Sequence, residues 1–264
     1  MSTASIPRLP EVDYPCSDGK PMAESEYQLH PLIYAISSLK AHFQSRQDVY
    51  VVGDMFLYYE KGDPSAVVTP DVFVVIGADN HLRDSYLLWK EPKVPDFVLE
   101  ITSHSTRSRD QGTKRGLYEY LGVTEYFCFD PTFDYLKPPL CGFRLQDGQY
   151  KPITPLIVTP AQVVLASQTL GLSLQLLDGE FRFIEPDTGR VLINYAEALE
   201  QRDAATKQRD AVTQERDAAV KRGAEEQAAR QEAEARLREL EATFAALSGD
   251  RDDGNTTQRG RNQN

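Results

Sequence analysis

The sequence predicts a mixed α/β domain followed by a C-terminal coiled-coil helix. Short apolar runs at 72–76 and 97–101 are typical of buried strands, and a helical pattern at 109–121 lies between the second run and a third at 125–130. A helix between two buried strands indicates a parallel pair joined by a crossover. From 194 to 247 there is one glycine and no proline, which favours a single long helix.

Four segments are expected in the chain of 264 residues. Residues 1–20 contain three prolines and little periodicity, which predicts a flexible arm. Residues 21–190 carry the strand and helix patterns of the α/β domain. Residues 191–247 form the helical segment, and the polar residues 248–264 are typical of a disordered tail.

The α/β domain is expected to begin with a helix within residues 21–46. Its apolar residues recur at helical steps and predict one buried face, made of Leu29, Leu32, Ile33, Ile36, Leu39 and Phe43. Pro31 fits the first turn of a helix, so the regular helix is expected to start near it. Glu24 lies close to this start, where a carboxylate either stabilises the positive end of the helix or serves as a third acid near a metal.

Several further elements follow from local patterns. Strands are expected at 49–52 and 55–59, and a helical stretch around 86–89. Two later hairpins with Asp-Gly turns at 147–148 and 178–179 are expected to form peripheral sheet.

The helical segment has a weak coiled-coil pattern. Related units that begin at Gln201, Gln208 and Glu215 recur every seven residues. The last apolar positions step by three, four and three, as in a coiled-coil seam, and these are Leu237, Leu240, Phe244 and Leu247. Because alanine fills most of the earlier seam positions, the helix is expected to need a partner and to form a homo-oligomer. The alternative is a solvated single helix.

The charge balance argues against a general nucleic-acid-binding protein. The net charge is −11, and residues 1–190 contain 17 basic and 25 acidic residues, whereas residues 191–264 contain 12 and 15. A DNA substrate would therefore require a local basic patch, a metal or a partner. Arg107, Arg109 and Arg115 form the best local patch and either contact phosphates or balance Asp110 and Glu119.

The remaining composition is typical of a cytoplasmic protein. No apolar run approaches the roughly 20 residues of a membrane span, and no signal-peptide pattern precedes the domain. Cys16, Cys128 and Cys141 show no CxxC pairing, so they favour a reducing compartment over a zinc site or a disulfide framework. Cys128, inside an apolar run, is interpreted as a core residue.

Two acids and a lysine form the strongest candidate site. Asp71 starts one predicted strand and Glu100 ends another, so both carboxylates can reach one ion if the strands are neighbours. Mg²⁺ prefers such oxygen ligands, and the backbone carbonyl of Ile101 is a further candidate ligand. A lysine nearby would orient water or stabilise developing charge, and Lys114 lies on the following predicted helix.

Other polar residues are weaker candidates. Asp96 precedes its strand and is interpreted as a turn residue. The four histidines show no shared metal-ligand spacing, although His104 could contact a phosphate from its polar loop; they are His30, His42, His81 and His104.

The spaced motifs resemble the Uma2 family, within the PD-(D/E)XK nuclease superfamily. They are Pro70-Asp71 with the apolar run after it, Glu100-Ile101-Thr102-Ser103 with Ser105-Thr106, Asp110 with Lys114 and Tyr118, and Gly122 to Phe127 with Asp130-Pro131. The resemblance covers about residues 22–190 and implies a restriction-endonuclease-like mixed sheet flanked by helices. Thr102 stands where the wider superfamily has a lysine, and the resemblance implies that Lys114 replaces it from the next helix.

The resemblance implies a metal-dependent deoxyribonuclease that cuts DNA endonucleolytically with Mg²⁺ or Mn²⁺. Asp71, Glu100 and Lys114 are then the catalytic residues, and Asp71, Glu100, the Ile101 carbonyl and Glu24 are the candidate metal ligands. Asp110, Lys114 and Tyr118 are spaced by four and share one face of the predicted helix. The alternative interpretation of this face is a surface pair between Asp110 and Lys114 with Tyr118 as a core residue. The alternative function is an inactive nuclease fold that binds nucleic acid or protein and assembles through its coiled coil. A serine hydrolase is disfavoured because no GxSxG motif is present.

Overall fold

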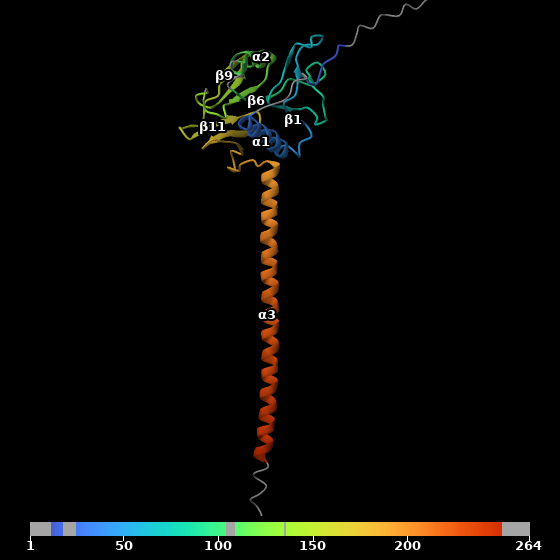
Figure 1. The fold of residues 1–264 in the computed structure, drawn as a ribbon, viewed down its shortest axis with the longest axis vertical. Coiled ribbons are helices and arrows are strands. Elements are labelled where there is room, and N and C mark those ends of the chain that lie inside the picture. Colours follow the sequence, from blue (N-terminus) through green and yellow to red (C-terminus); the bar gives the residue numbers. More distant parts are fainter. Residues whose placement is uncertain (1–11, 18–24, 104–108, 135, 250–264) are drawn as a thin grey trace, which may run out of the picture. The chain divides into compact units, whose positions relative to one another are not determined.

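The computed structural model describes residues 12–17, 25–103, 109–134 and 136–249 (Figure 1). It contains two compact units, residues 1–198 and 199–264, which are described separately. Among the sequence candidates, Glu24, His104 and Arg107 lie outside the described residues, as do most of the predicted N-terminal arm and the predicted tail from residue 250.

A six-stranded mixed sheet forms the centre of the first unit. Its strand order is β1-β4-β6-β7-β8-β9. The bounds are β1 Val49–Gly53, β4 Val72–Ile76, β6 Phe97–Ile101, β7 Glu125–Phe129, β8 Leu140–Gln146 and β9 Gln149–Pro152. Within this sheet β6 and β7 pair in parallel and the other neighbours are antiparallel. The predicted parallel pair, with a helical crossover between its strands, is therefore confirmed.

Two smaller sheets complete the β structure. One has the order β10-β11-β12-β13, and the other has the order β3-β2-β5. The bounds are β10 Ile157–Val158, β11 Gln162–Ser167, β12 Leu172–Leu177, β13 Glu180–Ile184, β2 Leu57–Tyr58, β3 Val67–Val68 and β5 Tyr86–Leu87. The expected helical stretch around Tyr86 is thus a short strand, because the backbone of Tyr86 and Leu88 pairs with the chain at 56–58.

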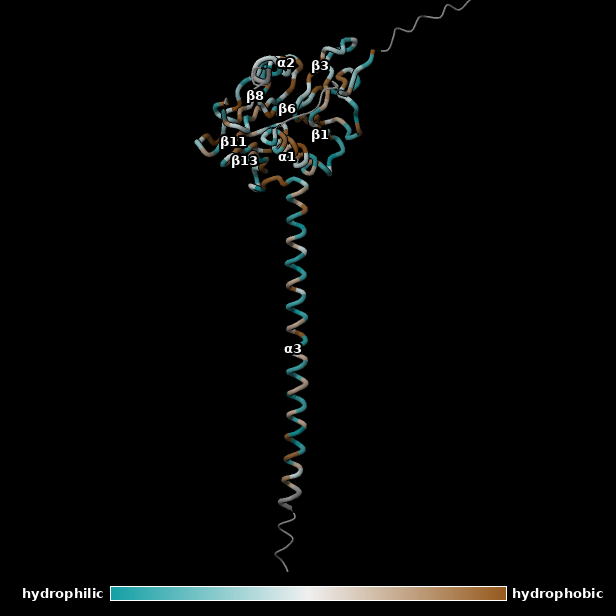
Figure 2. Tube along the Cα trace, in the orientation of Figure 1, coloured by the Kyte–Doolittle hydropathy of each residue, from teal (hydrophilic) through white to brown (hydrophobic). Residues whose placement is uncertain are grey.

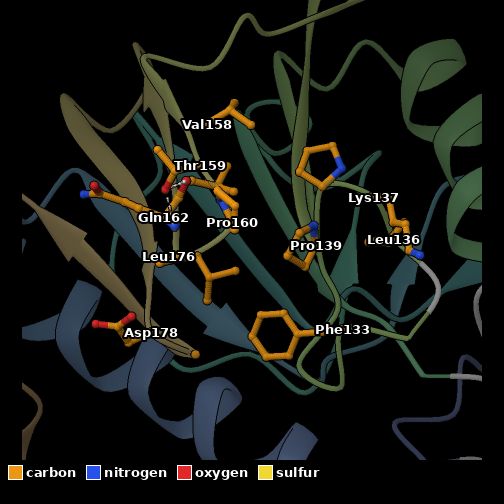
Figure 3. Close-up of a pocket in the computed structure, with 14 residues that line it drawn as sticks. Phe133, Leu136, Lys137, Pro139, Val158, Thr159, Pro160, Gln162, Leu176 and Asp178 are labelled. Atoms are coloured by element: carbon orange, nitrogen blue, oxygen red, sulfur yellow. Dashed lines mark hydrogen bonds between the residues drawn. The ribbon is translucent and has the colours of Figure 1, made fainter.

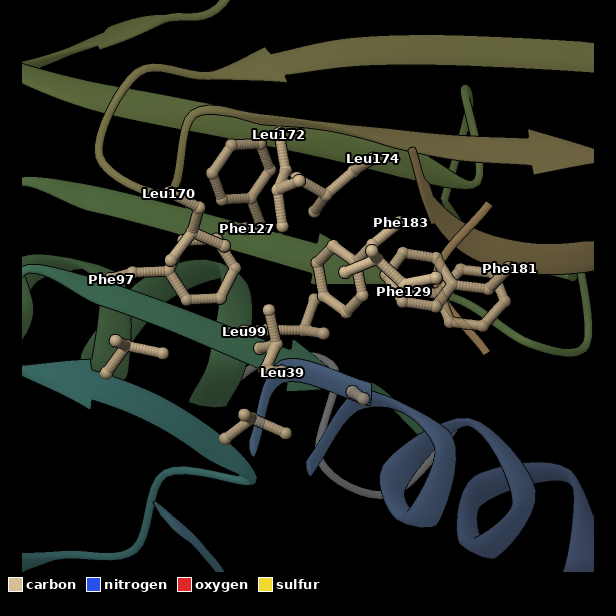
Figure 4. Close-up of a cluster of buried hydrophobic side chains, with 14 of the residues drawn as sticks. Leu39, Phe97, Leu99, Phe127, Phe129, Leu170, Leu172, Leu174, Phe181 and Phe183 are labelled. Atoms are coloured by element: carbon tan, nitrogen blue, oxygen red, sulfur yellow. The ribbon is translucent and has the colours of Figure 1, made fainter. Parts of the chain in front are cut away.

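The four-stranded sheet packs on one face of the central sheet, together with helix α1 (Glu26–His42). Figure 4 shows the rings of Phe129, Phe181 and Phe183 side by side in this core, with Leu39 of α1 close to them. Phe129 and Phe181 stack with ring centroids 5.1 Å apart. The hairpin at 172–184 is therefore a layer of the core, and its interpretation as peripheral sheet was wrong.

Both predicted Asp-Gly turns are confirmed. Asp147 and Gly148 have φ of 52° and 76°, and Asp178 and Gly179 have φ of 49° and 89°. Positive φ at both central residues is the geometry that joins two strands with a tight turn.

Helix α1 begins a turn earlier than Pro31 had suggested. The carbonyl of Ser25 accepts hydrogen bonds from the backbone of Gln28 and Leu29, so Pro31 lies inside the helix. The buried face also differs from the predicted stripe, since Leu29 and Ile33 are exposed whereas Tyr34, Ala35, Ser38 and Leu39 are buried. The hydroxyl of Tyr34 bonds to the Leu192 carbonyl at 2.8 Å, which fixes the face that points inward.

Within the predicted arm, residues 12–17 are described and contact the domain. The ring of Tyr14 lies 5.1 Å from Tyr58 and 4.9 Å from Trp89, and Tyr58 donates a 2.6 Å hydrogen bond to the Pro15 carbonyl. The flexibility and the boundary of the arm stay predictions.

Helix α3 spans Tyr195–Gly249 and confirms the predicted long helix. Asn194 and Glu197 cap its start reciprocally, since each side chain accepts a hydrogen bond from the other's backbone N–H at 2.9 Å. Figure 2 shows that α3 is hydrophilic over most of its length, with separated apolar positions. Among the described residues, no helix combines the length and the apolar character that a membrane span requires. The coiled coil stays a prediction.

Candidate active site

Asp71 directly precedes β4, and Glu100 lies on the neighbouring strand β6 of the central sheet. The register pairs Val72 of β4 with Leu99 of β6 in antiparallel orientation, so Asp71 and Glu100 stand at the next position of the same ladder. Residues opposite each other in a ladder project from the same face of the sheet. The predicted neighbour relation of the two carboxylates is therefore present.

The Asp71 carboxylate accepts a backbone hydrogen bond at the end of this ladder. Its Oδ2 accepts a 2.6 Å hydrogen bond from the backbone N–H of Ile101. The N–H and C=O of one strand residue point toward the same neighbouring strand. Because the Ile101 N–H points toward Asp71, the Ile101 carbonyl is directed toward the chain at β4 as well. Asp71 is half-buried, so solvent reaches this side of the site.

The Glu100 carboxylate is 1% exposed and is held by two side chains of the crossover. Its Oε2 lies 2.8 Å from the Nζ of Lys114, and its Oε1 accepts a 2.7 Å hydrogen bond from the hydroxyl of Tyr118. Lys114 Nζ also donates to the carbonyl of Thr69 at 3.1 Å, just before β4. Lys114 therefore joins the ends of both strands that carry the acids.

The crossover places Lys114 and Tyr118 one turn apart. A π-helical segment at Arg109–Lys114 is followed by α2, Arg115–Leu121, which ends at Gly122 with φ of 88°. Side chains four residues apart share a helix face. The spacing in the sequence predicts that both residues share one face, but it does not specify the contact of Tyr118 with Glu100.

The surroundings of Glu100 are aromatic and buried. Tyr118 is fully buried, and its ring lies 5.3 Å from the ring of Tyr126 on β7. Burial raises the pKa of Tyr126 strongly, and the nearby charge of Glu100 raises it further, so Tyr126 stays neutral. Low polarity of this kind strengthens the ion pair between Lys114 and Glu100.

Thr102 stands at the position where the resemblance implied a lysine in the wider superfamily. It is 1% exposed, its backbone N–H bonds to the Phe129 carbonyl at 2.8 Å, and its hydroxyl lies 3.3 Å from the same oxygen. Thr102 thus extends the pairing of β6 with β7, and the nearby ammonium group comes from Lys114.

The donor set suits a hard cation. Two carboxylates and a backbone carbonyl offer oxygen atoms, which Mg²⁺ and Mn²⁺ prefer. A carboxylate has about four lone-pair sites, so the hydrogen bonds described on Asp71 and Glu100 do not by themselves block a metal. No group of three His, Cys, Asp or Glu with metal-site geometry occurs among the described residues.

Several other candidates have structural surroundings. Asp96 caps the end of β4, because its Oδ2 accepts a 2.7 Å bond from the Ile76 backbone and its Oδ1 pairs with Lys93. Among the described histidines, His81 contacts Asp79 and His42 lies 3.8 Å from Glu185. The two contacts of Asp96 support its interpretation as a turn residue.

Only part of the predicted basic patch can be placed. Arg115 is exposed, and its guanidinium lies 4.9 Å from the centre of the Phe143 ring. Arg109 and Asp110 belong to the π-helical segment, but their side chains lie outside the described part of the structure. Lys114 itself is buried, which contradicts the alternative of a pair on the surface.

A large apolar cavity of about 860 Å³ lies elsewhere, between Phe133 with residues 136–139 and the four-stranded sheet. Figure 3 shows Phe133, Pro139, Pro160 and Leu176 around it. Asp71, Glu100 and Lys114 do not line this cavity. The candidate active site therefore does not include this cavity.

Comparisons with known proteins give one family. The model of the Uma2 family, described as "Putative restriction endonuclease", matches residues 8–179, which is more than half of the chain. A solved structure described as "a putative nuclease belonging to DUF820 from Anabaena variabilis" is 16% identical, with a TM-score of 0.39 over 58% of this chain and 84% of that one. No curated protein matches the chain.

Proposed function

Because this chain belongs to the Uma2 family, we propose that it is a metal-dependent endonuclease that hydrolyses DNA phosphodiester bonds. The observation that supports this most is the convergence of Asp71, Glu100 and Lys114 where β4 begins and β6 ends, next to each other in the central sheet. They come from the position directly before β4, from the end of β6 and from the helical crossover. Side chains held in this way are suited to positioning a reactive group.

Asp71, Glu100 and the Ile101 carbonyl would hold Mg²⁺ or Mn²⁺. Such a cation makes bound water more nucleophilic and neutralises charge on the phosphate. Asp71 would contribute charge at the solvent side, and Glu100 would contribute it from the buried side. Tyr118 fixes the orientation of Glu100 through its hydroxyl.

We assign Lys114 to the electrostatic part of the reaction. Its ammonium is buried beside Glu100, where positive charge is screened little by solvent. There it would orient the attacking water or stabilise the negative charge that develops on the phosphate. Because residues 1–190 have more acidic than basic residues, local positive charge at this site is needed to hold a DNA strand.

The test is incubation of the full chain with supercoiled plasmid and Mg²⁺ or Mn²⁺, beside an Asp71→Ala, Glu100→Ala double variant. Metal-dependent nicking or linearisation by the wild type alone is the expected result. Equal cleavage by the double variant would reject this site as the source of activity.

A second candidate function is an inactive nuclease fold that binds nucleic acid or protein. Three observations favour it: the acidic domain, the threonine at 102, and a Lys114 ammonium that already pairs with Glu100. Calorimetry with Mg²⁺ and fluorescence anisotropy with labelled DNA separate the two functions. Binding of metal or DNA without any cleavage would favour this candidate.

We also propose that α3 joins copies of the chain into a homo-oligomer through the seam at Leu237, Leu240, Phe244 and Leu247. Described side chains of α3 from 199 to 245 are all exposed in the single chain. A long helix with apolar positions at coiled-coil spacing gains stability by burying them against a partner helix.

A further inference from the structure

Cys128 and Cys141 stand directly opposite each other on β7 and β8. In the same ladder, the Asp130 backbone donates a 2.8 Å hydrogen bond to the Pro139 carbonyl. Hydrogen-bonded pairs alternate along an antiparallel ladder, so Cys128 and Cys141, two positions away, form such a pair with Cα atoms about 5.5 Å apart. A disulfide spans Cα separations of about 4.4–6.8 Å.

The two thiols are free and line one cavity of about 550 Å³. Arg115 of α2, Lys137 and Phe143 line it as well. Cys128 is buried, whereas Cys141 is half-buried and forms the more accessible sulfur. A small oxidant that enters the cavity therefore meets both sulfur atoms, and it meets Cys141 first.

The surroundings of Cys141 favour its thiolate. A hydrogen bond from the Cys128 thiol and the positive charge of Arg115 lower the pKa of Cys141. The thiolate is the reactive form of cysteine toward peroxides and disulfides. Cys16, by contrast, is exposed and lies outside this cavity.

We propose that Cys128 and Cys141 form a reversible disulfide when the protein meets hydrogen peroxide. The Cys141 thiolate attacks one peroxide oxygen, the O–O bond breaks, and after proton transfer a sulfenic acid and one water remain. The Cys128 sulfur then attacks the Cys141 sulfur, the S–S bond forms, and the S–O bond breaks with release of a second water. Two thiols lose two electrons and two protons, and the peroxide is reduced to two waters.

The geometry makes this disulfide easy to reduce. Opposite residues in a ladder have Cβ atoms about 4.5–5.5 Å apart, whereas a disulfide brings them to about 3.5–4.5 Å. Closing the bond therefore pulls β7 and β8 together and stores strain, and strained disulfides are the labile ones.

The two cysteines also lie next to the candidate active site. Cys128 is the register partner of Glu100 in the parallel pairing of β6 and β7. Movement of Cys128 toward Cys141 changes the packing beside Glu100. A reversible loss of DNA cleavage on oxidation is the expected consequence, and this consequence alone rests on the proposed nuclease function.

The test is treatment of the full chain with hydrogen peroxide, followed by thiol titration, intact mass and peptide mapping. We expect the wild type to lose two of its three thiols and the mass of two hydrogen atoms, and to yield a Cys128–Cys141 linked peptide. Cys16→Ser is the matched control and should form the same link. Cys128→Ser should stop at a Cys141 sulfenic acid that dimedone traps, and dithiothreitol should restore both thiols in the wild type.

A chain in which peroxide oxidises Cys16 while Cys128 and Cys141 stay free would overturn the proposal, and so would further oxidation of Cys141 without any link. The mapping needs no variant, so a misfolded variant does not decide the result. If the link forms and cleavage is unchanged, the coupling to Glu100 is wrong. If no cleavage exists before oxidation, the proposed nuclease function fails while the thiol result still stands.

Discussion

The Nζ of Lys114 lies 2.8 Å from the Oε2 of Glu100, and the Glu100 side chain is 1% exposed. Removing one partner of a buried ion pair leaves a charge that is neither solvated nor balanced. A cation bound to the Glu100 carboxylate would neutralise its negative charge in place of Lys114. Bound Mg²⁺ is therefore expected to restore part of the unfolding free energy that is lost when Lys114 is removed. It does not replace the ammonium group that Lys114 offers to the reaction.

The first prediction concerns Lys114→Ala. Without metal, this variant should lose about 3–5 kcal/mol of unfolding free energy in urea, because Glu100 is left buried and unbalanced. Mg²⁺ should raise the melting temperature of the variant more than that of the wild type, and calorimetry should show that metal binding is kept while cleavage is lost. Lys93→Ala, which breaks a partly exposed pair with Asp96, is the control and should cost at most about 1 kcal/mol. Loss of metal binding together with activity would refute the role assigned to Lys114.

The second prediction concerns Tyr118→Phe. The hydroxyl of Tyr118 donates to Glu100 at 2.7 Å and both side chains are buried, so its removal should cost about 1–3 kcal/mol of unfolding free energy. Tyr120→Phe on the same helix is the matched control, because Tyr120 is 84% exposed and should tolerate the change. Urea denaturation measures both. Equal stability of the two variants would mean that the Glu100 contact contributes nothing.

The third prediction separates charge from structure at Asp71. Asp71→Asn keeps an oxygen that accepts the Ile101 N–H, so unfolding free energy should change little. Loss of the negative charge should weaken Mg²⁺ binding in calorimetry and abolish plasmid cleavage. The exposed Asp84→Asn changes the same charge away from the site and should leave both properties intact. Unaltered metal binding in Asp71→Asn would exclude Asp71 as a ligand.

The fourth prediction concerns Gly53, where β1 passes close to Asp71. A Cβ added at Gly53 would lie 2.5 Å from the Asp71 carbonyl and would also collide with the side chain of Ile36. Gly53→Ala should therefore cost about 1–3 kcal/mol of unfolding free energy. Gly223→Ala, in the exposed helix α3, meets no atom and should instead raise helix content measured by circular dichroism. A fully stable Gly53→Ala variant would show that β1 can move away from Asp71.

Local sequence patterns were sufficient to predict the elements that carry the site. The apolar runs at 72–76 and 97–101 are strands with the predicted bounds, and the spacing of Lys114 and Tyr118 placed both on one helix face. These features depend on neighbouring residues, since strand and helix periodicities are local. They fixed the candidate residues but not the contacts between them.

Long-range packing decided what the patterns missed. The inward face of α1 depends on Tyr34, whose partner at Leu192 lies 158 residues away. The same holds for the core position of the 172–184 hairpin, because its aromatic residues find their partner in Phe129. The hydrogen bond from Tyr118 to Glu100 likewise joins separate elements, and no local spacing specifies such a partner.

The last prediction concerns the seam of α3. Leu240 is 64% exposed in the single chain, and burying a leucine side chain contributes about 1.5–3 kcal/mol, so the full chain is expected to form an oligomer in sedimentation velocity. Leu240→Asp places a charge in the seam and should yield a monomer. Ala242→Asp introduces the same charge two residues away, outside the seam, and should leave the oligomer intact. Arg236 and Glu241 flank the seam at the spacing that pairs opposite charges between parallel helices, so high salt should weaken the assembly. A wild-type chain that sediments as a monomer would instead establish α3 as a solvated single helix.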